Sequence, residues 1–213
     1  MKSYILLFVL LLGIIPTMFY NVFADVIEGT EGDDTLDGTD SDDIIGGKEG
    51  NDEINGLAGA DDIKGDEGKD TINGGDDNDV LSGGKSRDII HGDAGKDKIS
   101  GKGSNDELYG DDGKDKLTGG EGDDTLRGGD GNDKINGNEG TDKLYGGKGN
   151  DKIWGDTGRD YIDAGKGDDT IDIGIDDIIA DKSIDTVKCG PGKDTVKNVG
   201  DNDDISDDCE EII

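Results

Sequence analysis

Residues 119–127 read GGEGDDTLR, and residues 128–136 continue directly with GGDGNDKIN. Both follow one nine-residue pattern, Gly-x-x-Gly-x-Asp-x-(Ile/Leu)-x, which fills residues 29–172 sixteen times without an insertion or a deletion. Self-similarity at a fixed short period is typical of repeat architectures, in which each repeat is one unit stacked on its neighbours. The repeat, rather than any single motif, therefore determines the predicted fold.

Three columns of the pattern are nearly fixed. The eighth position is always Ile or Leu, and the first is glycine except at Ala164. The fourth position is glycine in most copies, with departures at Ser41, Asp77, Ser86 and Ser104. The sixth position is aspartate in every copy: Asp34, Asp43, Asp52, Asp61, Asp70, Asp79, Asp88, Asp97, Asp106, Asp115, Asp124, Asp133, Asp142, Asp151, Asp160 and Asp169.

The composition does not describe an ordinary globular core. The 213 residues include 40 glycines, only 29% are hydrophobic, and the formal net charge is −32. Low hydrophobicity with high charge normally favours disorder, but a disordered tail would not return an Ile or Leu every ninth residue. A folded state needs cations to neutralise its carboxylates. So acidic a chain is a good candidate for binding cations and a poor one for binding nucleic acid.

The repeat also indicates its local structure. Glycines at the first and fourth positions permit a tight turn, so the first six residues are expected to form a loop. The last three residues alternate outward, inward and outward, as a short half-buried strand does. A chain that repeats loop and strand in this order winds into a coil, with parallel strands stacked about 4.8 Å apart. The Ile/Leu column then fills a thin core.

The sixth-position aspartate lies where each loop meets its strand, beside turn carbonyls. Carboxylate and carbonyl oxygens are the ligands that calcium prefers, and calcium accepts them in flexible geometry. Stacked loops therefore predict calcium sites between neighbouring repeats.

At this point the sequence resembles the RTX, or hemolysin-type, calcium-binding nonapeptide repeats. The resemblance implies an all-β parallel β-roll, a β-solenoid of about eight coils with two nonapeptides per coil and calcium between loops eighteen residues apart. About fourteen ions would fill such a roll, and their charge would nearly cancel that of the chain. The loops without glycine at the fourth position, and those at the two ends, are expected to be the weaker sites.

The amino-terminal residues 1–24 have a basic start at Lys2, an apolar run and a compact ending at Ala24. This pattern predicts a secretory signal peptide, with an uncleaved membrane anchor as the alternative. The repeats are expected outside the cytoplasm in either case, secreted or associated with the cell surface, and the mature chain is expected to have no membrane span. Residues 25–28 are interpreted as a lead-in to the roll.

Residues 173–213 are interpreted as a cap of degenerate repeats. An Asp-x-(Ile/Val) element recurs at residues 176–178, 185–187, 194–196 and 203–205, in a phase shifted by a two-residue deletion. Residues 189–194 retain the full loop chemistry, so Asp194 joins the predicted calcium ligands. In an eighteen-residue coil Cys189 lies within reach of Cys209, and a disulfide is typical of an exported chain. Two free or metal-binding thiols are the alternative.

Stacking also sorts the outward residues into ladders. One strand column carries His91, Tyr109, Arg127 and Tyr145 at the ninth position, and the other carries Lys98, Lys116, Lys134 and Lys152 at the seventh. These ladders could bind an acidic polysaccharide or another cell-surface component. Alternatively, they form a solvated face, on which the lysines offset the carboxylates and the aromatic rings pack against one another.

The chain contains one histidine, so it has no set of residues for a His-based catalytic triad or a zinc cluster. We expect a non-enzymatic calcium-binding protein with a structural or interaction role at the cell surface or in the extracellular matrix. The alternatives are a glycan-binding or adhesive module, and an accessory RTX module of an extracellular enzyme system.

Overall fold

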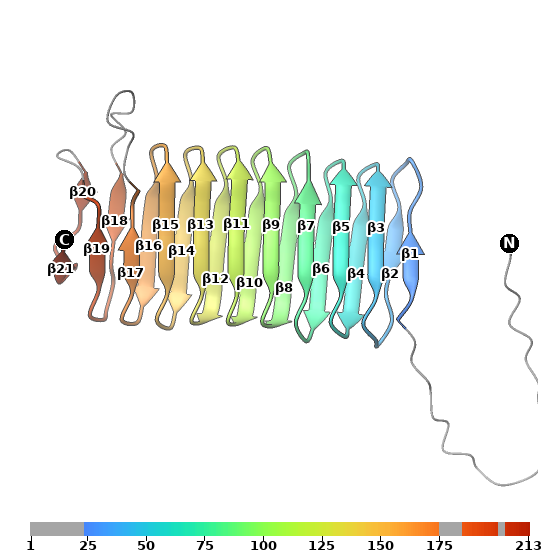
Figure 1. Ribbon diagram of the computed structural model, residues 1–213, viewed down its shortest axis with the longest axis horizontal. Helices are drawn as coiled ribbons and strands as arrows, with labels where there is room; N and C mark the ends of the chain where they lie inside the picture. Colours follow the sequence, from blue (N-terminus) through green and yellow to red (C-terminus); the bar gives the residue numbers. More distant parts are fainter. Residues whose placement is uncertain (1–23, 175–184, 200–202) are drawn as a thin grey trace, which may run out of the picture.

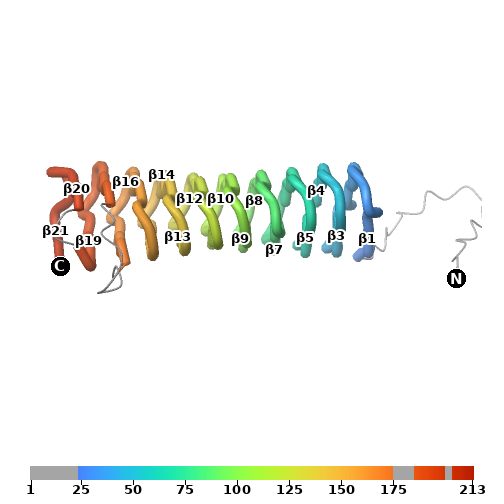
Figure 2. Tube along the Cα trace, turned by 90° about the horizontal axis from the view of Figure 1, so that it is seen from above, coloured from blue at the N-terminus to red at the C-terminus, as the bar shows by residue number. Residues whose placement is uncertain are grey.

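The computed structural model describes residues 24–174, 185–199 and 203–213. These residues form strands and loops, with no helix. The strands stack into one long roll, with the chain rising by one coil after every second strand (Figure 1, Figure 2). The predicted all-β parallel β-roll is therefore confirmed.

The roll consists of two parallel sheets, which face each other across the core. The odd-numbered sheet has eleven strands: β1 (Val26–Glu28), β3 (Ile44–Glu49), β5 (Asp62–Glu67), β7 (Val80–Gly84), β9 (Lys98–Gly103), β11 (Lys116–Glu121), β13 (Lys134–Glu139), β15 (Lys152–Thr157), β17 (Thr170–Asp172), β19 (Thr195–Lys197) and β21 (Glu211–Ile212). The even-numbered sheet has ten: β2 (Thr35–Asp37), β4 (Glu53–Ala58), β6 (Thr71–Asp76), β8 (Ile89–Gly95), β10 (Glu107–Gly113), β12 (Thr125–Gly131), β14 (Lys143–Lys148), β16 (Tyr161–Lys166), β18 (Thr186–Lys188) and β20 (Asp204–Ile205).

The register between neighbouring strands is eighteen residues throughout the nonapeptides. Leu108 lies beside Leu126, for example, and Leu117 beside Ile135. Two nonapeptides therefore make one coil, as expected, and successive nonapeptides lie in opposite sheets. From β3 onward most strands are longer than predicted, because they continue from the seventh position through the third position of the next repeat.

The core consists mainly of the eighth-position side chains, one column from each sheet. All of them from Ile45 to Ile171 are buried, and Val187 and Val196 extend the columns into the carboxyl-terminal part. Burying such a side chain contributes about 2 kcal/mol. Since each coil adds only two of them, the hydrophobic core is thin for a roll of this length.

The roll is longer than its sixteen nonapeptides. The lead-in forms β1, which pairs with β3 in the same eighteen-residue register, and four short strands follow Asp172. The structure thus has about ten turns rather than the eight of the nonapeptides alone.

The described carboxyl-terminal strands keep the predicted phase, but the shift in phase arises differently from the prediction. Tyr161 pairs with Thr186, a separation of 25 residues, so the chain here contains an insertion of seven residues instead of a two-residue deletion. The reason is that residues 185–187 supply both groups that β16 needs next to it, a buried Val187 beside Ile162 and a carboxylate on Asp185. A shortening by two residues occurs later, where Thr195 pairs with Glu211.

Three of the four predicted elements after Asp172 are strands, namely β18, β19 and β20, and β21 was not predicted. The remaining element, residues 176–178, lies outside the described residues, as does the expected signal peptide apart from Ala24. Within the described part of the chain, no helix is long and apolar enough to cross a membrane.

Candidate calcium sites

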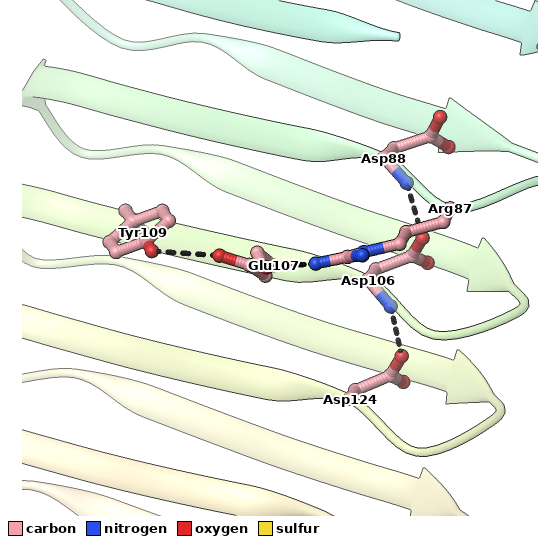
Figure 3. A network of polar contacts seen from close by, with 6 residues as sticks. All are labelled: Arg87, Asp88, Asp106, Glu107, Tyr109 and Asp124. Atoms are coloured by element: carbon pink, nitrogen blue, oxygen red, sulfur yellow. Dashed lines mark hydrogen bonds and ion pairs between the residues drawn. The ribbon is translucent and has the colours of Figure 1, made fainter. Parts of the chain in front are cut away.

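The sixth-position aspartates form two continuous ladders along the roll. From Asp43 onward, the Oδ1 atom of each accepts a hydrogen bond from the backbone N–H of the aspartate one coil earlier. Asp88 N–H donates to Asp106 at 2.8 Å, and Asp106 N–H donates to Asp124 at 2.7 Å (Figure 3). From Asp43 to Asp169 every one of these side chains is at least 98% buried. The backbone of the preceding coil therefore holds each of these carboxylates in place even without a bound ion.

The second carboxylate oxygen, Oδ2, is left without a partner over most of the roll. Burial of an ionised oxygen without a hydrogen bond or a counter-ion costs several kcal/mol, so it requires a proton or a cation. The Oδ2 atoms that are buried and accept no hydrogen bond from the protein belong to Asp52, Asp61, Asp70, Asp79, Asp88, Asp97, Asp106, Asp115, Asp124, Asp133, Asp142, Asp151, Asp160, Asp169 and Asp194.

From Asp61 onward, burial raises the pKa of these carboxyl groups above the ordinary value of 3.8. It raises the pKa of Asp88 to about 7 and that of Asp142 to about 6. The pKa of Asp106 and of Asp160 rises to about 8. In each case desolvation dominates, and the backbone hydrogen bond to the carboxylate opposes it. A divalent cation would remove this penalty, so the donor set fits calcium.

The first-position glycine brings further oxygens close to Oδ2. A Cβ atom added to Gly119 would lie 2.3 Å from Oδ2 of Asp124 and 2.7 Å from the carbonyl oxygen of Gly137 in the next coil. The carboxylate and a loop carbonyl thus converge where any side chain would collide with them. This contact explains why the first column is glycine, and it gathers the hard oxygen ligands that calcium prefers.

The first two nonapeptides differ from all the others. Oδ2 of Asp34 accepts hydrogen bonds from Thr30 N–H at 2.6 Å and Thr30 Oγ1 at 2.9 Å. Oδ2 of Asp43 accepts the same pair from Thr39, at 2.7 and 3.0 Å. These two carboxylates are predicted calcium ligands, but the threonine at the second position already satisfies the oxygen that is free elsewhere.

The backbone changes at the same boundary. The second position of every nonapeptide from Lys48 onward has a positive φ, whereas Thr30 and Thr39 do not. Lys48 also places its ammonium group 2.8 Å from the carbonyl oxygen of Gly29, where a cation would find a ligand. The amino-terminal coil is therefore closed by its own side chains.

Two of the four loops without a fourth-position glycine keep the positive φ that glycine favours. Asp77 has a φ of +79°, and Ser104 has a φ of +81°. The expectation that these loops bind calcium more weakly stays a prediction.

A further kind of ladder, formed by side chains at the fifth position of the nonapeptides, was not predicted from the sequence. Side-chain oxygens of Asp or Asn there accept the backbone N–H of the residue one coil later, as Asn51 N–H donates to Asp33 at 2.7 Å and Thr141 N–H donates to Asp123 at 2.8 Å. The frequency of Asp and Asn at the fifth position was the available signal. This ladder satisfies the loop backbone, so it holds the stacked loops in register.

The two ladders of buried carboxylates continue after Asp172. Asp169 N–H donates to Oδ1 of Asp194 at 2.9 Å, and Asp160 N–H donates to Asp185 at 2.8 Å. Asp194 N–H in turn donates to Glu210 at 2.8 Å, so a longer carboxylate ends this column. Asp185 and Asp203 were predicted only as parts of strand elements and not as ligands, but they continue the other ladder.

Cys189 and Cys209 form the predicted disulfide, with their Cα atoms 5.2 Å apart. Asp208 reinforces the link, because it accepts the backbone N–H of Gly190 at 3.0 Å. The alternative of two free thiols is therefore not what the structure contains.

The aromatic stripe lies on the outer face of the even-numbered sheet and packs on itself. The rings of His91 and Tyr109 are stacked, with centroids 4.3 Å apart, and Arg127 lies between Tyr109 and Tyr145 at 5.2 and 4.9 Å from the ring centroids. Glu107 joins the stripe from the side, where it contacts Arg87 and accepts the Tyr109 hydroxyl at 3.2 Å (Figure 3). The cross-strand packing expected of these residues is confirmed.

The lysines expected on the other face do share one row. Lys98, Lys116, Lys134 and Lys152 begin β9, β11, β13 and β15, and each is the register partner of the next. Whether either face binds a partner stays a prediction.

Comparison with known proteins supports the same identification. No curated protein matches the chain. A family model described as the RTX calcium-binding nonapeptide repeat matches it six times, at residues 21–54, 46–81, 73–108, 100–135, 109–144 and 136–171. Together these matches cover residues 21–171, which is more than half of the 213 residues. With its eighteen-residue coils and stacked aspartate ladders, the chain belongs to the RTX calcium-binding nonapeptide repeat family.

Proposed function

We propose that this is an exported protein whose roll folds when calcium binds between the stacked loops, and that it has a structural or interaction role at the cell surface or in the extracellular matrix. The observation that carries the proposal is the row of buried, unpartnered Oδ2 atoms from Asp52 to Asp169. An apo roll must either protonate these carboxylates or leave them charged in a dry interior.

Electrostatics makes the folding conditional on the ion. The chain has 54 acidic and 22 basic residues, so repulsion expands it when no cation is present. Calcium binds only the stacked loops, and by mass action it stabilises the folded state. Each loop contributes oxygens to its neighbours, so binding should be cooperative, with affinities around 10⁻⁴ to 10⁻³ M that suit an extracellular module.

The proposed ligands are the unpartnered carboxylates together with loop carbonyls. The number of ions, about fourteen by coil geometry, is part of the proposal. The two threonine-closed loops reduce it, because Asp34 and Asp43 already have hydrogen-bond donors at Oδ2.

Export and the absence of catalysis also belong to the proposal. The composition of residues 1–24 and the disulfide between Cys189 and Cys209 support an oxidising compartment outside the cytoplasm. The ring of His91, the one histidine of the chain, stacks on Tyr109 and its Nδ1 lies 2.9 Å from Asp111, which supports a packing role for it. The alternatives are an adhesive glycan-binding module and an accessory module of an extracellular enzyme system.

A calcium titration of chelator-treated protein tests the proposal. Circular dichroism should show a cooperative gain of strand signal, and small-angle scattering should show compaction from an expanded chain to an elongated rod. Magnesium at the same concentrations should do much less, because it demands a stricter octahedral geometry. Equal strand signal and equal dimensions in excess chelator and in calcium would refute the coupling of ion to fold.

A further inference from the structure

We propose that the outer face of the odd-numbered sheet binds a linear anionic polysaccharide, which lies along the roll axis over a strip of lysines. The strip consists of Lys98, Lys116, Lys134 and Lys152 at the starts of four neighbouring strands, with Lys96 and Lys114 two residues before the first two of them. All six side chains are exposed. The proposal rests on the calcium-dependent folding proposed above, since only the folded roll brings these lysines together.

These lysines have no counter-ions on the described part of the protein. Some lysines elsewhere on the roll do pair, such as Lys48 with Glu28 at 3.1 Å and Lys148 with Asp130 at 2.7 Å, whereas others, such as Lys143, form no ion pair with a described residue. No such pair, and no side-chain hydrogen bond, involves any of the six lysines of the strip. In a chain of net charge −32, a row of unpaired cations is the exception.

The strip is narrow and free of acidic groups at the strand starts. The outward ninth positions of the same four strands carry Ser100, Thr118, Asn136 and Trp154, all uncharged. Asp172, on the neighbouring strand β17, lies beside Trp154 at the end of the row. On the four strands themselves the nearest acids are Asp156, four residues after Lys152, and Glu121 and Glu139, five residues after Lys116 and Lys134, which is roughly 13 to 16 Å away in an extended strand. That separation exceeds the Debye length of about 8 Å at physiological ionic strength, so they do not neutralise the lysines.

The row of lysines destabilises the sheet by charge repulsion, and a bound polyanion would remove this repulsion. Like charges directly opposite each other on neighbouring strands destabilise a sheet. The buried aspartates below, such as Asp97 and Asp115, partly balance the lysines while they are ionised and free. Once calcium neutralises those carboxylates, the strip is left with uncompensated positive charge. Binding of an anionic polymer should therefore require calcium even when the polymer itself does not bind calcium.

The geometry favours a single polysaccharide chain over nucleic acid. Ammonium groups repeat at the strand spacing of about 4.8 Å in a straight line, which suits an extended chain with regularly spaced anionic groups. Hydroxyl and amide side chains at the ninth position can bond sugar hydroxyls, and Trp154 offers one ring face at the end of the row. A duplex would extend over the acidic ends of the strands, and single-stranded nucleic acid usually requires several stacking aromatic residues.

Trp154 makes the test specific to this face, because it is the one tryptophan of the chain and is register partner to Asn136 and Asp172 on the same sheet. Carboxymethyl dextran, dextran sulfate and unmodified dextran would be titrated into the protein at saturating calcium while Trp154 emission is recorded. Both anionic polymers should shift the emission and bind with an affinity that falls as salt rises, and dextran should do neither.

The variant K98Q/K116Q/K134Q/K152Q should lose at least tenfold in affinity for both anionic polymers. The matched control K69Q/K143Q/R159Q/K166Q removes the same charge from the even-numbered sheet and its loops, and it should bind like the parent. The double variant K116Q/K134Q, which perturbs the sheet less, should show an intermediate loss.

Several outcomes would overturn the proposal. These are an affinity of the strip variant within threefold of the parent, an equal loss in the control, no binding by the parent, or tighter binding of oligothymidylate than of the dextrans. Circular dichroism on the same samples separates the two hypotheses. A protein that folds on calcium but does not bind the polymers would refute only the polysaccharide site. Strand signal that does not respond to calcium would refute the proposed function.

Discussion

At the scale of single residues, the side chain at the second position of each nonapeptide decides how its buried carboxylate is satisfied. Thr30 and Thr39 each donate two hydrogen bonds to Oδ2 of their aspartate. From Lys48 onward the second position takes a positive φ, a conformation that β-branched residues avoid, and Oδ2 is left without a donor. Threonine and calcium are thus alternative solutions to the same desolvation problem.

We therefore predict that T30G/T39G binds more calcium than the parent, by one or two ions per chain. The substitution removes the competing hydroxyl groups and lets the second position of both loops take the positive φ found from Lys48 onward, where no donor reaches Oδ2, so Asp34 and Asp43 become free to ligate. Native mass spectrometry in a calcium series would count the ions. In low calcium the variant should also be less stable, since it loses the two hydroxyl hydrogen bonds, worth about 1 kcal/mol each.

The control for this experiment is T71G/T125G, which makes the same change at two strand positions on the outer face of the even-numbered sheet. Its calcium count should equal that of the parent. An unchanged count in T30G/T39G would contradict the view that threonine excludes the ion from the first coil.

At the scale of the structural elements, the carboxyl groups of each aspartate ladder influence one another, because, in addition to burial, the charge of an aspartate one coil away raises the pKa of its neighbour, as for Asp79 and Asp115. The members of each ladder are hydrogen-bonded in series, and burial raises the pKa of several of them to between about 6 and about 8, as for Asp97 and Asp106. The unfolded chain has an aspartate pKa near 3.8. Between these values the metal-free folded state holds more protons than the unfolded state, so its stability falls as the pH rises.

The predicted consequence is a metal-free roll that is most stable below about pH 4 and loses that contribution between about pH 4 and pH 8. In chelated buffers, strand signal should therefore decrease as pH rises, and calcium should restore it at pH 8. Near pH 5, where the chelated protein should still keep strand signal, calcium binding should release the protons of the ladder, and calorimetry in buffers of different ionisation enthalpy would measure the release. Carboxylates that are already ionised release none, so zero proton release from protein that has kept its strand signal would show that the ladder is not protonated.

The sequence correctly predicted those elements whose residues recur in every repeat. An aliphatic residue every ninth position can be buried only if the chain coils, so the Ile/Leu column predicted both strands and core. Departures from the average loop were harder to predict, because they depend on contacts one coil away. The fifth-position ladder and the partner of Tyr161 illustrate this, because only the stacking of the coils shows which atoms meet. Thr30 differs, since its contact with Asp34 lies within one loop and depends on the conformation of that loop.

At the scale of the whole molecule, the roll is close to a one-dimensional stack in which each coil contacts only the coils before and after it. Stability in such a stack is a sum of coil and interface terms, so the two ends need separate protection. Here the ends use different chemistry. The amino-terminal coil is closed by threonine hydrogen bonds, and the carboxyl-terminal coils are closed by a disulfide together with Asp208 and Glu210.

Removing the disulfide should therefore loosen one end of the roll and leave the rest intact. A bridge that closes a loop of about twenty residues contributes about 3 kcal/mol, which corresponds to roughly a hundredfold in local opening. In C189S/C209S at saturating calcium, hydrogen exchange of the amides in β18–β21 should accelerate by up to that factor, while the amides in β5–β13 should exchange as in the parent. Uniform acceleration along all the strands would instead mean that the roll opens as one cooperative unit, against the nearest-neighbour description.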